Sequence, residues 1–172
     1  MLIPIVELIT ESDVEQKLIW PLLTAMFPDG FGLFAPDIVT KLSIRRLTIG
    51  KGSSRKLYFP DYMIVLAGLP VLVIEAKAPG ESVEQGLDEA RLYGNELNCI
   101  FPSSINPCVR VLSCNGDTIM SCPIDTAEPD IILAHSDLTS THSGFAKLVD
   151  FCCRTSLQRH ADDIRRKLRK DT

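Results

Sequence analysis

Hydrophobic residues spaced three and four apart predict a helix in the first thirty residues. The segment 12–15 has the S-x-x-E form of a capping box, and Thr10 offers an alternative N-cap. Pro21 lies inside the hydrophobic stripe and has no backbone N–H, so we expect it to kink or divide the helix. The stripe itself is made by Val14, Leu18, Leu22 and Ala25.

After residue 38 the pattern shortens to the alternation and short runs that are typical of β-strands. A half-exposed strand begins at 38 and ends in a Gly- and Ser-rich loop at 50–54. The two strongest strand candidates, 58–66 and 71–74, are separated by four residues that suit a tight hairpin. Three shorter strands are expected at 109–112, 119–120 and 130–133.

Two later segments have helical periodicity. Residues 82–97 form the first, with Ser82 as N-cap, and residues 143–170 form an amphipathic closing helix with a basic end. The order is helix, three strands, helix, strands, helix, without a repeat or a linker. We therefore predict one α/β domain, 1–172, in which helices flank a central mixed β-sheet.

The composition agrees with one folded domain and excludes several protein classes. The chain has 172 residues, of which 45% are hydrophobic and 23% charged, so it is neither disordered nor fibrous. No apolar run reaches the roughly 18 residues of a membrane span. The opening apolar stretch is too short for a signal peptide. The size leaves no room for a helicase or ATPase motor. The six cysteines contain no C-x-x-C pair and indicate reduced thiols in the cytoplasm.

The net charge of −4 hides two basic segments. Six of the 18 Lys and Arg residues lie in 38–60, which has no acid, and seven lie in 154–170. Such segments can be ordinary solvated faces, or they can contact nucleic acid. Because the first segment leads directly into an acidic cluster, its bases are candidate phosphate contacts: Arg45, Arg46, Lys51, Arg55 and Lys56.

Three charged residues stand where the surrounding sequence is apolar. Asp61 lies in the first strong strand, and Glu75 and Lys77 lie at the end of the next. A hairpin would set Asp61 opposite the region of Glu75, and strand alternation puts Glu75 and Lys77 on one face. Two neighbouring carboxylates resist ionisation unless a cation neutralises them, and hard oxygen ligands suit Mg²⁺ or Mn²⁺. A metal beside Lys77 could activate water against a phosphodiester. The structural alternative is a cross-strand salt bridge.

These charged residues belong to a motif. The segments 59–62 (FPDY) and 74–77 (IEAK), with thirteen residues between Asp61 and Glu75, resemble the motif of the PD-(D/E)xK nuclease superfamily. More narrowly, residues 10–120 resemble the N-terminal nuclease domain of type I restriction enzyme R subunits. The order of all the matching elements is more specific than the short D…ExK core. The further matching segments are 10–15, 18–23, 75–80 and 113–116, the last being similar to that family's Thr-Asn-Gly turn.

The resemblance implies a restriction-endonuclease-like core and a metal-dependent endonuclease activity. It makes Asp61 and Glu75 ligands of Mg²⁺ or Mn²⁺, together with the backbone carbonyl of Ala76. It makes Lys77 the catalytic lysine.

Two helices add candidates through the same resemblance. The superfamily often supplies an acid from the first helix; Glu11 fits that pattern better than Glu15, which can instead belong to the capping box. Related nucleases often carry Gln-x-x-x-Tyr in the helix after the lysine, where both side chains contact DNA or the site. This chain has Gln85 and Tyr93 on one helix face, with Glu89 in the position where Gln is expected.

Other cofactor chemistry has no sequence signal. The cysteines and the three histidines lack the closely spaced pairs of a zinc site. Nothing supplies a base for a thiol nucleophile, and no G-x-x-x-x-G-K-[ST] loop is present.

The leading hypothesis is a Mg²⁺-dependent DNA endonuclease module of a restriction or defence system. Its partners would be DNA and the motor and specificity subunits or domains of a larger system; cutting both strands would need a homodimer or a second encounter. The alternative is a non-catalytic nucleic-acid-binding or regulatory domain on the same fold. A third reading is an α/β interaction domain whose acids form ordinary salt bridges. DNA versus RNA, sequence preference and fragment status stay open.

Overall fold

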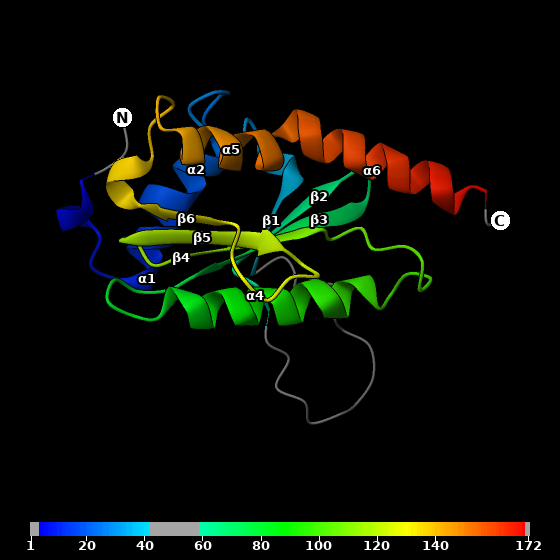
Figure 1. Cartoon of the computed structure of the whole chain (residues 1–172), viewed down its shortest axis with the longest axis horizontal. Helices are drawn as coiled ribbons and strands as arrows, with labels where there is room; N and C mark the ends of the chain where they lie inside the picture. Colours follow the sequence, from blue (N-terminus) through cyan, green and yellow to red (C-terminus); the bar gives the residue numbers. More distant parts are fainter. Residues whose placement is uncertain (1–3, 42–58, 171–172) are drawn as a thin grey trace.

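Six strands form one mixed sheet in the computed structural model of the chain, which describes residues 4–41 and 59–170. The parallel pair is β3–β4, and the other neighbouring pairs are antiparallel. Helices cover both faces of the sheet (Figure 1), so the predicted α/β class with a central mixed sheet is confirmed. Strand order follows chain order: β1 (Ile38–Thr40), β2 (Tyr62–Leu66), β3 (Leu69–Ala76), β4 (Arg110–Cys114), β5 (Thr118–Pro123) and β6 (Ile131–Ala134).

The strands lie close to the positions expected from the sequence. The half-exposed strand from 38 is present as β1, and the three later strands are β4, β5 and β6. β2 begins at Tyr62, later than expected. Residues 42–58, which include the expected loop at 50–54, lie outside the described residues.

The β2–β3 hairpin is tighter than the sequence pattern indicates. Its turn has two residues, Ala67 and Gly68, whose φ angles of 52° and 79° suit a two-residue hairpin. The expected turn also included Leu69 and Pro70, but both belong to β3. Pro70 is tolerated because the β2–β3 register shifts beside it, where the hydrogen-bond ladder is interrupted.

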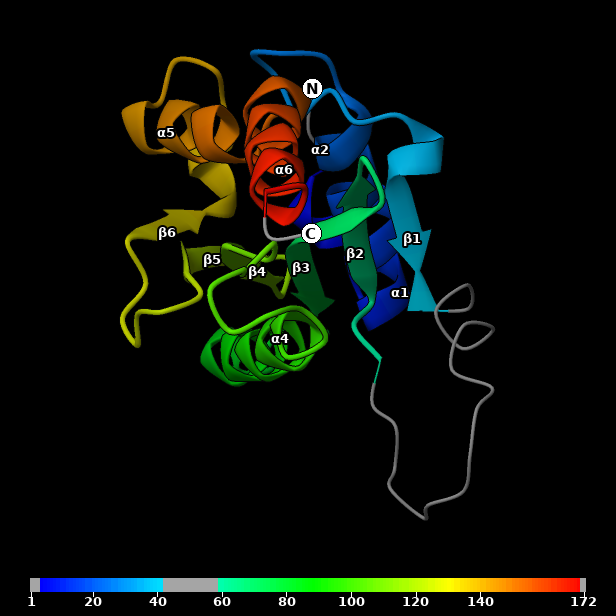
Figure 2. The same ribbon diagram turned by 90° about the vertical axis from the view of Figure 1, so that its right-hand side faces the viewer.

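Helix α4 (Val83–Asn98) crosses one face of the sheet between the parallel strands β3 and β4 (Figure 2). Parallel neighbours cannot be joined by a hairpin, so the chain must cross a face between them. The helix agrees with the expected range, and the Ser82 hydroxyl caps it by accepting from the Gln85 N–H at 3.1 Å. The small core under α4 consists of Val73, Val83, Leu87, Ala90, Tyr93, Cys108, Val111, Met120 and Cys122.

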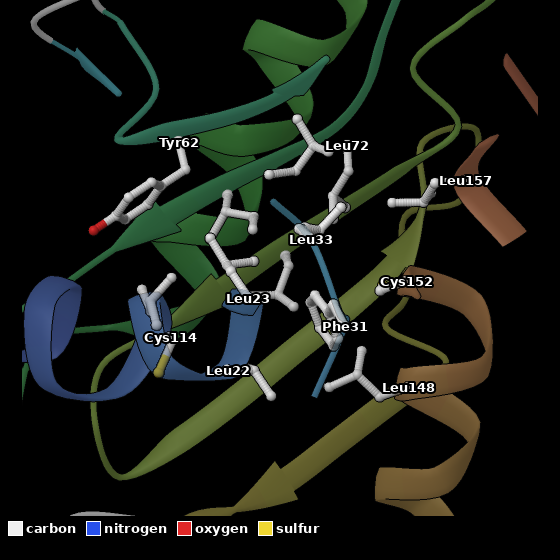
Figure 3. Close-up of a cluster of buried hydrophobic side chains, with 14 of the residues drawn as sticks. Leu22, Leu23, Phe31, Leu33, Tyr62, Leu72, Cys114, Leu148, Cys152 and Leu157 are labelled. Atoms are coloured by element: carbon white, nitrogen blue, oxygen red, sulfur yellow. The ribbon is translucent and has the colours of Figure 1, made fainter. Parts of the chain in front are cut away.

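The opposite face carries the larger core, under the helical segment 11–24 and the helices α5 (Ser143–Cys152) and α6 (Arg154–Leu168). Figure 3 shows side chains from these helices meeting those of the sheet. The stripe residues predicted for the first and last helices are buried here, except that Ala25 is only half-buried and Met26, expected to widen the first stripe, is 71% exposed. Those in the core are Val14, Leu18, Leu22, Phe145, Leu148, Val149, Cys152 and Leu157.

Pro21 divides the first helical segment by changing its hydrogen-bond spacing. The segment consists of α1 (Glu11–Asp13), a π-helical turn (Val14–Ile19) and α2 (Trp20–Thr24). Proline cannot donate to a carbonyl four residues earlier. Just before it, the Trp20 N–H bonds instead to the Glu15 carbonyl, five residues back. The expected division is therefore a change from π-helical to α-helical hydrogen bonding between Ile19 and Trp20, and α2 continues through Pro21.

The capping box of this segment is formed by Thr10 and Asp13. The Asp13 N–H donates to the Thr10 hydroxyl at 3.1 Å, and the Thr10 N–H donates to the Asp13 carboxylate at 2.9 Å. The box predicted at 12–15 is wrong, and the alternative cap Thr10 is confirmed. As a result, the Glu15 side chain is not used for capping.

The single closing helix predicted over 143–170 is wrong, because the chain breaks at Cys153 into α5 and α6. Cys153 is extended, with φ −65° and ψ 149°. The next N–H, of Arg154, donates to the carbonyl of Phe31 at 2.7 Å, and the Arg154 side chain pairs with Asp37. Contacts with residues far away in the sequence therefore fix the break between α5 and α6.

Short 3₁₀ turns complete the described structure, at Ile5–Glu7, Ala35–Asp37 and His135–Asp137. All six cysteines are free thiols. Within the described ranges, the chain has no helix that combines the length and apolar character needed to cross a membrane.

Candidate metal and catalytic centre

The β2–β3 hairpin brings Asp61 and Glu75 together. Its register sets Tyr62 opposite Ile74, so Asp61, directly before β2, falls beside Glu75 near the end of β3. Only 3% of Asp61 and 4% of Glu75 is exposed. The structure therefore contains the juxtaposition expected from the hairpin, and it buries both carboxyl groups.

Asp61 uses both of its carboxylate oxygens. Oδ2 accepts from the Ala76 N–H at 2.8 Å, and Oδ1 lies 2.9 Å from the Lys41 ammonium nitrogen. Burial acts to lower the pKa of Lys41, but the hydrogen bond to Asp61 and the nearby Glu11 and Glu75 carboxylates outweigh it and raise the pKa. Lys41 is thus a permanent positive charge at the centre of this acidic cluster.

The pairing of Lys41 with Asp61 was not predicted from the sequence, which indicated only a phosphate-contacting segment there. The pair follows from the strand order. Thr40 lies opposite Tyr62 in the β1–β2 register, so Lys41 lies beside Asp61, and its backbone N–H donates to the Asp61 carbonyl at 3.1 Å. The pairing of β1 with β2 was the missing information.

Glu75, like Glu11 and Glu15, forms no salt bridge among the described residues, where the two nearby lysines pair with Asp61 and Glu89. Its Oε1 is buried and makes no hydrogen bond to any group in the described part of the chain. Burial, and then the neighbouring Asp61 carboxylate, raise the pKa of Glu75 to about 9. On β4 the register partner of Glu75 is Ser113, whose hydroxyl is also buried without a partner among the described residues. This corner of the site therefore has unused hydrogen-bonding capacity.

Glu11 and Glu15 both approach Asp61. One carboxylate oxygen from each of the three residues lies within 4.8 Å of the others, an arrangement that could hold a metal ion. Burial and then Asp61 raise the pKa of both glutamates. The Tyr62 hydroxyl donates to the Glu15 carbonyl at 3.0 Å and ties this helical segment to β2. The sequence favoured Glu11 over Glu15, whereas the structure brings both to Asp61.

Lys77 points to helix α4 and not to an acid of the sheet. Its ammonium nitrogen lies 2.5 Å from Glu89 Oε2, and Gln85 donates to Glu89 Oε1 at 2.9 Å. The cross-strand salt bridge considered as an alternative is therefore not the pairing of Lys77. Burial acts to lower the pKa of Lys77, but the bond to Glu89 outweighs it and raises the pKa.

Gly86 lets α4 approach the sheet closely enough for this contact. A Cβ at Gly86 would lie 2.2 Å from Ser113 Oγ and 3.1 Å from Lys77 Cγ. Any larger residue would therefore push the helix from the strand ends. The importance of this glycine was not recognised in the sequence, because it depends on which strand the helix covers.

The expected nucleic-acid contacts on α4 are mostly occupied within the protein. Tyr93 is buried in the small core, where burial and then Glu75 raise its pKa. Gln85 is exposed, but its amide is bonded to Glu89. Tyr93 therefore acts as a wall of the site and not as an exposed DNA contact.

The turn at 113–116 fastens the segment that follows Lys77. The Asn115 amide nitrogen donates to the Glu81 carbonyl at 2.7 Å, and its oxygen accepts from the Thr118 N–H at 2.9 Å. Gly116 has φ 89°, a conformation that favours glycine. The Asn-Gly pair thus links the β4–β5 turn to the loop before α4.

The two basic segments differ in what the structure describes. Arg45, Arg46, Lys51, Arg55 and Lys56 lie outside the described residues. In α6, His160 makes a 2.9 Å hydrogen bond to the Pro107 carbonyl, near the start of β4. β3 and β4 are parallel, so that end of the sheet is opposite to Glu75, and α6 runs on away from the centre (Figure 1).

No family model, no curated protein and no solved structure matches the chain. The chemistry of the centre must therefore be judged from its own residues. Carboxylate oxygens of Glu11, Glu15 and Asp61 lie within 4.8 Å of one another, and Glu75 lies beside Asp61, near a lysine held by α4. Clustered hard oxygen ligands of this kind suit Mg²⁺ or Mn²⁺.

Proposed function

We propose that the chain is a Mg²⁺-dependent endonuclease that hydrolyses DNA phosphodiester bonds on a restriction-endonuclease-like core. The observation that carries the proposal is the Glu75 carboxyl group, which is buried beside Asp61 with an unpartnered oxygen and a pKa of about 9. A buried carboxyl oxygen without a hydrogen-bond partner, next to another acid, is costly unless a cation binds it.

The donor set fits a hard divalent cation. Asp61, Glu75 and the backbone carbonyl of Ala76 would hold it, as the resemblance implies, together with Glu11 or Glu15, each with a carboxylate oxygen within 4.8 Å of an Asp61 oxygen. When bound, such an ion lowers the pKa of a coordinated water and offsets negative charge on the phosphoryl group. The raised pKa values of Glu75, Glu11 and Glu15 describe the protein without that ion.

The residues of the chain have separate tasks in this proposal. The carboxylates provide the negative charge that binds the cation. Lys77, with a raised pKa, keeps an ammonium group next to the end of β3, where it holds the attacking water and stabilises negative charge on the phosphate. Tyr93 and the small core under α4 close the inner side of the site against solvent.

DNA as substrate is supported by the basic segment that begins at Lys41. Phosphate contacts from Arg45, Arg46, Lys51, Arg55 and Lys56 would hold the duplex backbone next to the acids, as counter-charges do in nucleic-acid binding. Motor and specificity subunits of a restriction or defence system belong to the same proposal, through the resemblance to R-subunit nuclease domains.

The deciding experiment is cleavage of duplex DNA with Mg²⁺ or Mn²⁺ by the wild type and by Lys77→Ala. We expect Lys77→Ala to lose cleavage by about 10²-fold or more while keeping the wild-type circular dichroism spectrum. Lys17→Ala is the matched control, because Lys17 pairs with Asp13 on the surface. Full activity of Lys77→Ala would contradict the proposal.

Metal binding separates the alternative functions. Calorimetric titration with Mn²⁺ should give binding to the wild type and none to Asp61→Ala. Salt-sensitive DNA binding without metal or product would instead identify a non-catalytic nucleic-acid-binding domain. Absence of both metal and DNA binding would identify the carboxylates as ordinary salt-bridge partners.

A further inference from the structure

The side chain of Lys77 is enclosed, although the residue directly follows a strand. Only 16% of it is exposed, and its aliphatic part packs against the α4 backbone at Gly86, where no side chain intervenes. Its backbone N–H donates to the Cys114 carbonyl at 2.9 Å, which extends the β3–β4 pairing by one residue. Both ends of this flexible side chain are therefore held.

Glu89 is itself held in a single orientation. One carboxylate oxygen bonds Lys77 and the other bonds Gln85, one helical turn earlier on α4. Burial acts to raise the pKa of Glu89, but its bonds to Lys77 and Gln85 outweigh it and lower the pKa. The carboxylate thus contacts Lys77 at the end of β3, although 33% of the Glu89 side chain is exposed.

A neutral side chain at position 89 could not hold the Lys77 ammonium group in the same way. A divalent cation among Asp61, Glu75 and the first-helix acids would repel the Lys77 ammonium. Glu89 supplies the opposite charge that keeps the ammonium beside the cation. Glutamine, which related nucleases often carry here, can accept a hydrogen bond but cannot offset that repulsion.

We infer that Glu89 is a positioning residue that holds the Lys77 ammonium in place for hydrolysis, an inference that rests on the proposed nuclease function. Glu89 touches neither the carboxylate cluster nor the substrate in this role. It acts through Lys77, and Gln85 and Gly86 support it.

The test compares Glu89→Gln with Glu96→Gln, which removes the same charge from an exposed position of α4. Glu and Gln have similar helix propensities, so both variants should fold. Two measurements are made on each: the ¹⁵N signal of the Lys77 ammonium in the metal-free protein, and kcat and KM for duplex DNA with Mg²⁺.

We expect Glu89→Gln to broaden or lose the Lys77 signal and to lower kcat by about 10²-fold, with KM within about twofold. Glu89→Asp should recover part of kcat, since it restores the charge at a shorter reach. Glu96→Gln should match the wild type in both measurements.

Three results would overturn the inference. An unchanged Lys77 signal with unchanged kcat would show that Glu89 does not hold the lysine. A lower KM with unchanged kcat would show that Glu89 faces DNA and repels it, and a higher kcat would show that it holds Lys77 back. Failure of the nuclease function is recognised separately, because the wild type would then cleave no DNA with Mg²⁺ or Mn²⁺ while the Lys77 signal still reported on the pair.

Discussion

At the scale of single residues, two lysines neutralise Asp61 and Glu89, and Glu75, Glu11 and Glu15 form no salt bridge among the described residues. Lys41 takes Asp61, and Lys77 takes Glu89. Asp61, Glu75 and Lys77 could be predicted from the sequence because each is a charged residue in or next to an apolar strand. Their partners could not, since Lys41 reaches Asp61 through the β1–β2 register and Glu89 reaches Lys77 through the seating of α4.

Lys41 competes with any cation that binds Asp61. Its side chain is 45% exposed, so solvent weakens the pair, and removing it should tighten Mn²⁺ binding by about fivefold, or roughly 1 kcal/mol. Titration of Lys41→Met by calorimetry tests this. Lys17→Met is the control, because Lys17 has a similar exposure of 43% in a pair with Asp13. Weaker binding in Lys41→Met would count against competition.

Glu75 should make the metal-free protein less stable as the pH rises. Its pKa is about 9 in the folded chain and 4.5 in the ordinary carboxyl group, so between these values the folded state keeps a proton that the unfolded state has released. Folding then binds protons, and stability is greatest below about pH 4.5 and falls towards pH 9, by at most about 1.4 kcal/mol per pH unit.

Glu75→Gln isolates this effect, because the amide cannot ionise. With chelator present, we expect the variant to melt at a higher temperature than the wild type at about pH 8.5 and at a similar temperature at about pH 5. Parallel melting curves for both proteins across this range would contradict the raised pKa. Added Mg²⁺ should reduce the difference, since it favours the ionised carboxylate.

At the scale of elements, local sequence patterns were enough to predict most strands and α4. They failed where contacts between residues distant in sequence determine the secondary structure. The break at Cys153 has neither proline nor glycine, and it depends on the Arg154 N–H bond to Phe31 and on the Arg154–Asp37 pair. The capping box was predicted at the wrong residues because the candidates at 10–13 and 12–15 overlap. Thr10 is the N-cap because it forms reciprocal hydrogen bonds with Asp13.

The seating of α4 depends on Gly86. Gly86→Ala would place a methyl group against Ser113 and Lys77, and we expect it to destabilise the fold by about 1–3 kcal/mol and to lower cleavage by displacing Lys77. Urea denaturation measures the first effect. Asn95→Ala, on the exposed side of α4, is the control and should change stability by no more than about 0.5 kcal/mol. Wild-type stability in Gly86→Ala would mean that the helix can shift freely.

At the scale of the whole molecule, the predicted α/β class with helices on both faces of a mixed sheet was within reach of the sequence. The relative placement of the charged segments was not. The basic end of α6 lies at the opposite end of the sheet from Glu75, because α6 passes the start of β4 and continues outward. A run of basic residues in the sequence does not indicate toward which end of the sheet its helix extends.

The basic end of α6 should therefore contribute little to cleavage. Changing Arg165, Arg166 and Lys167 together to Gln should leave kcat within about twofold, and the salt dependence of DNA binding should keep its slope. Changing Arg45 and Arg46 to Gln provides the comparison and should reduce that slope by about one per lost phosphate contact. A reduced slope in the α6 variant would place DNA across the far end of the sheet.

The two-residue turn at Ala67–Gly68 has a consequence for folding. Hairpins of this kind form in about 1–10 μs from local contacts, whereas the β3–β4 pair must wait for the intervening crossover through α4. Asp61 and Glu75 are therefore expected to meet before Glu89 fixes Lys77. The topology thus brings these two carboxyl groups of the centre together early on the folding path and fixes its lysine late.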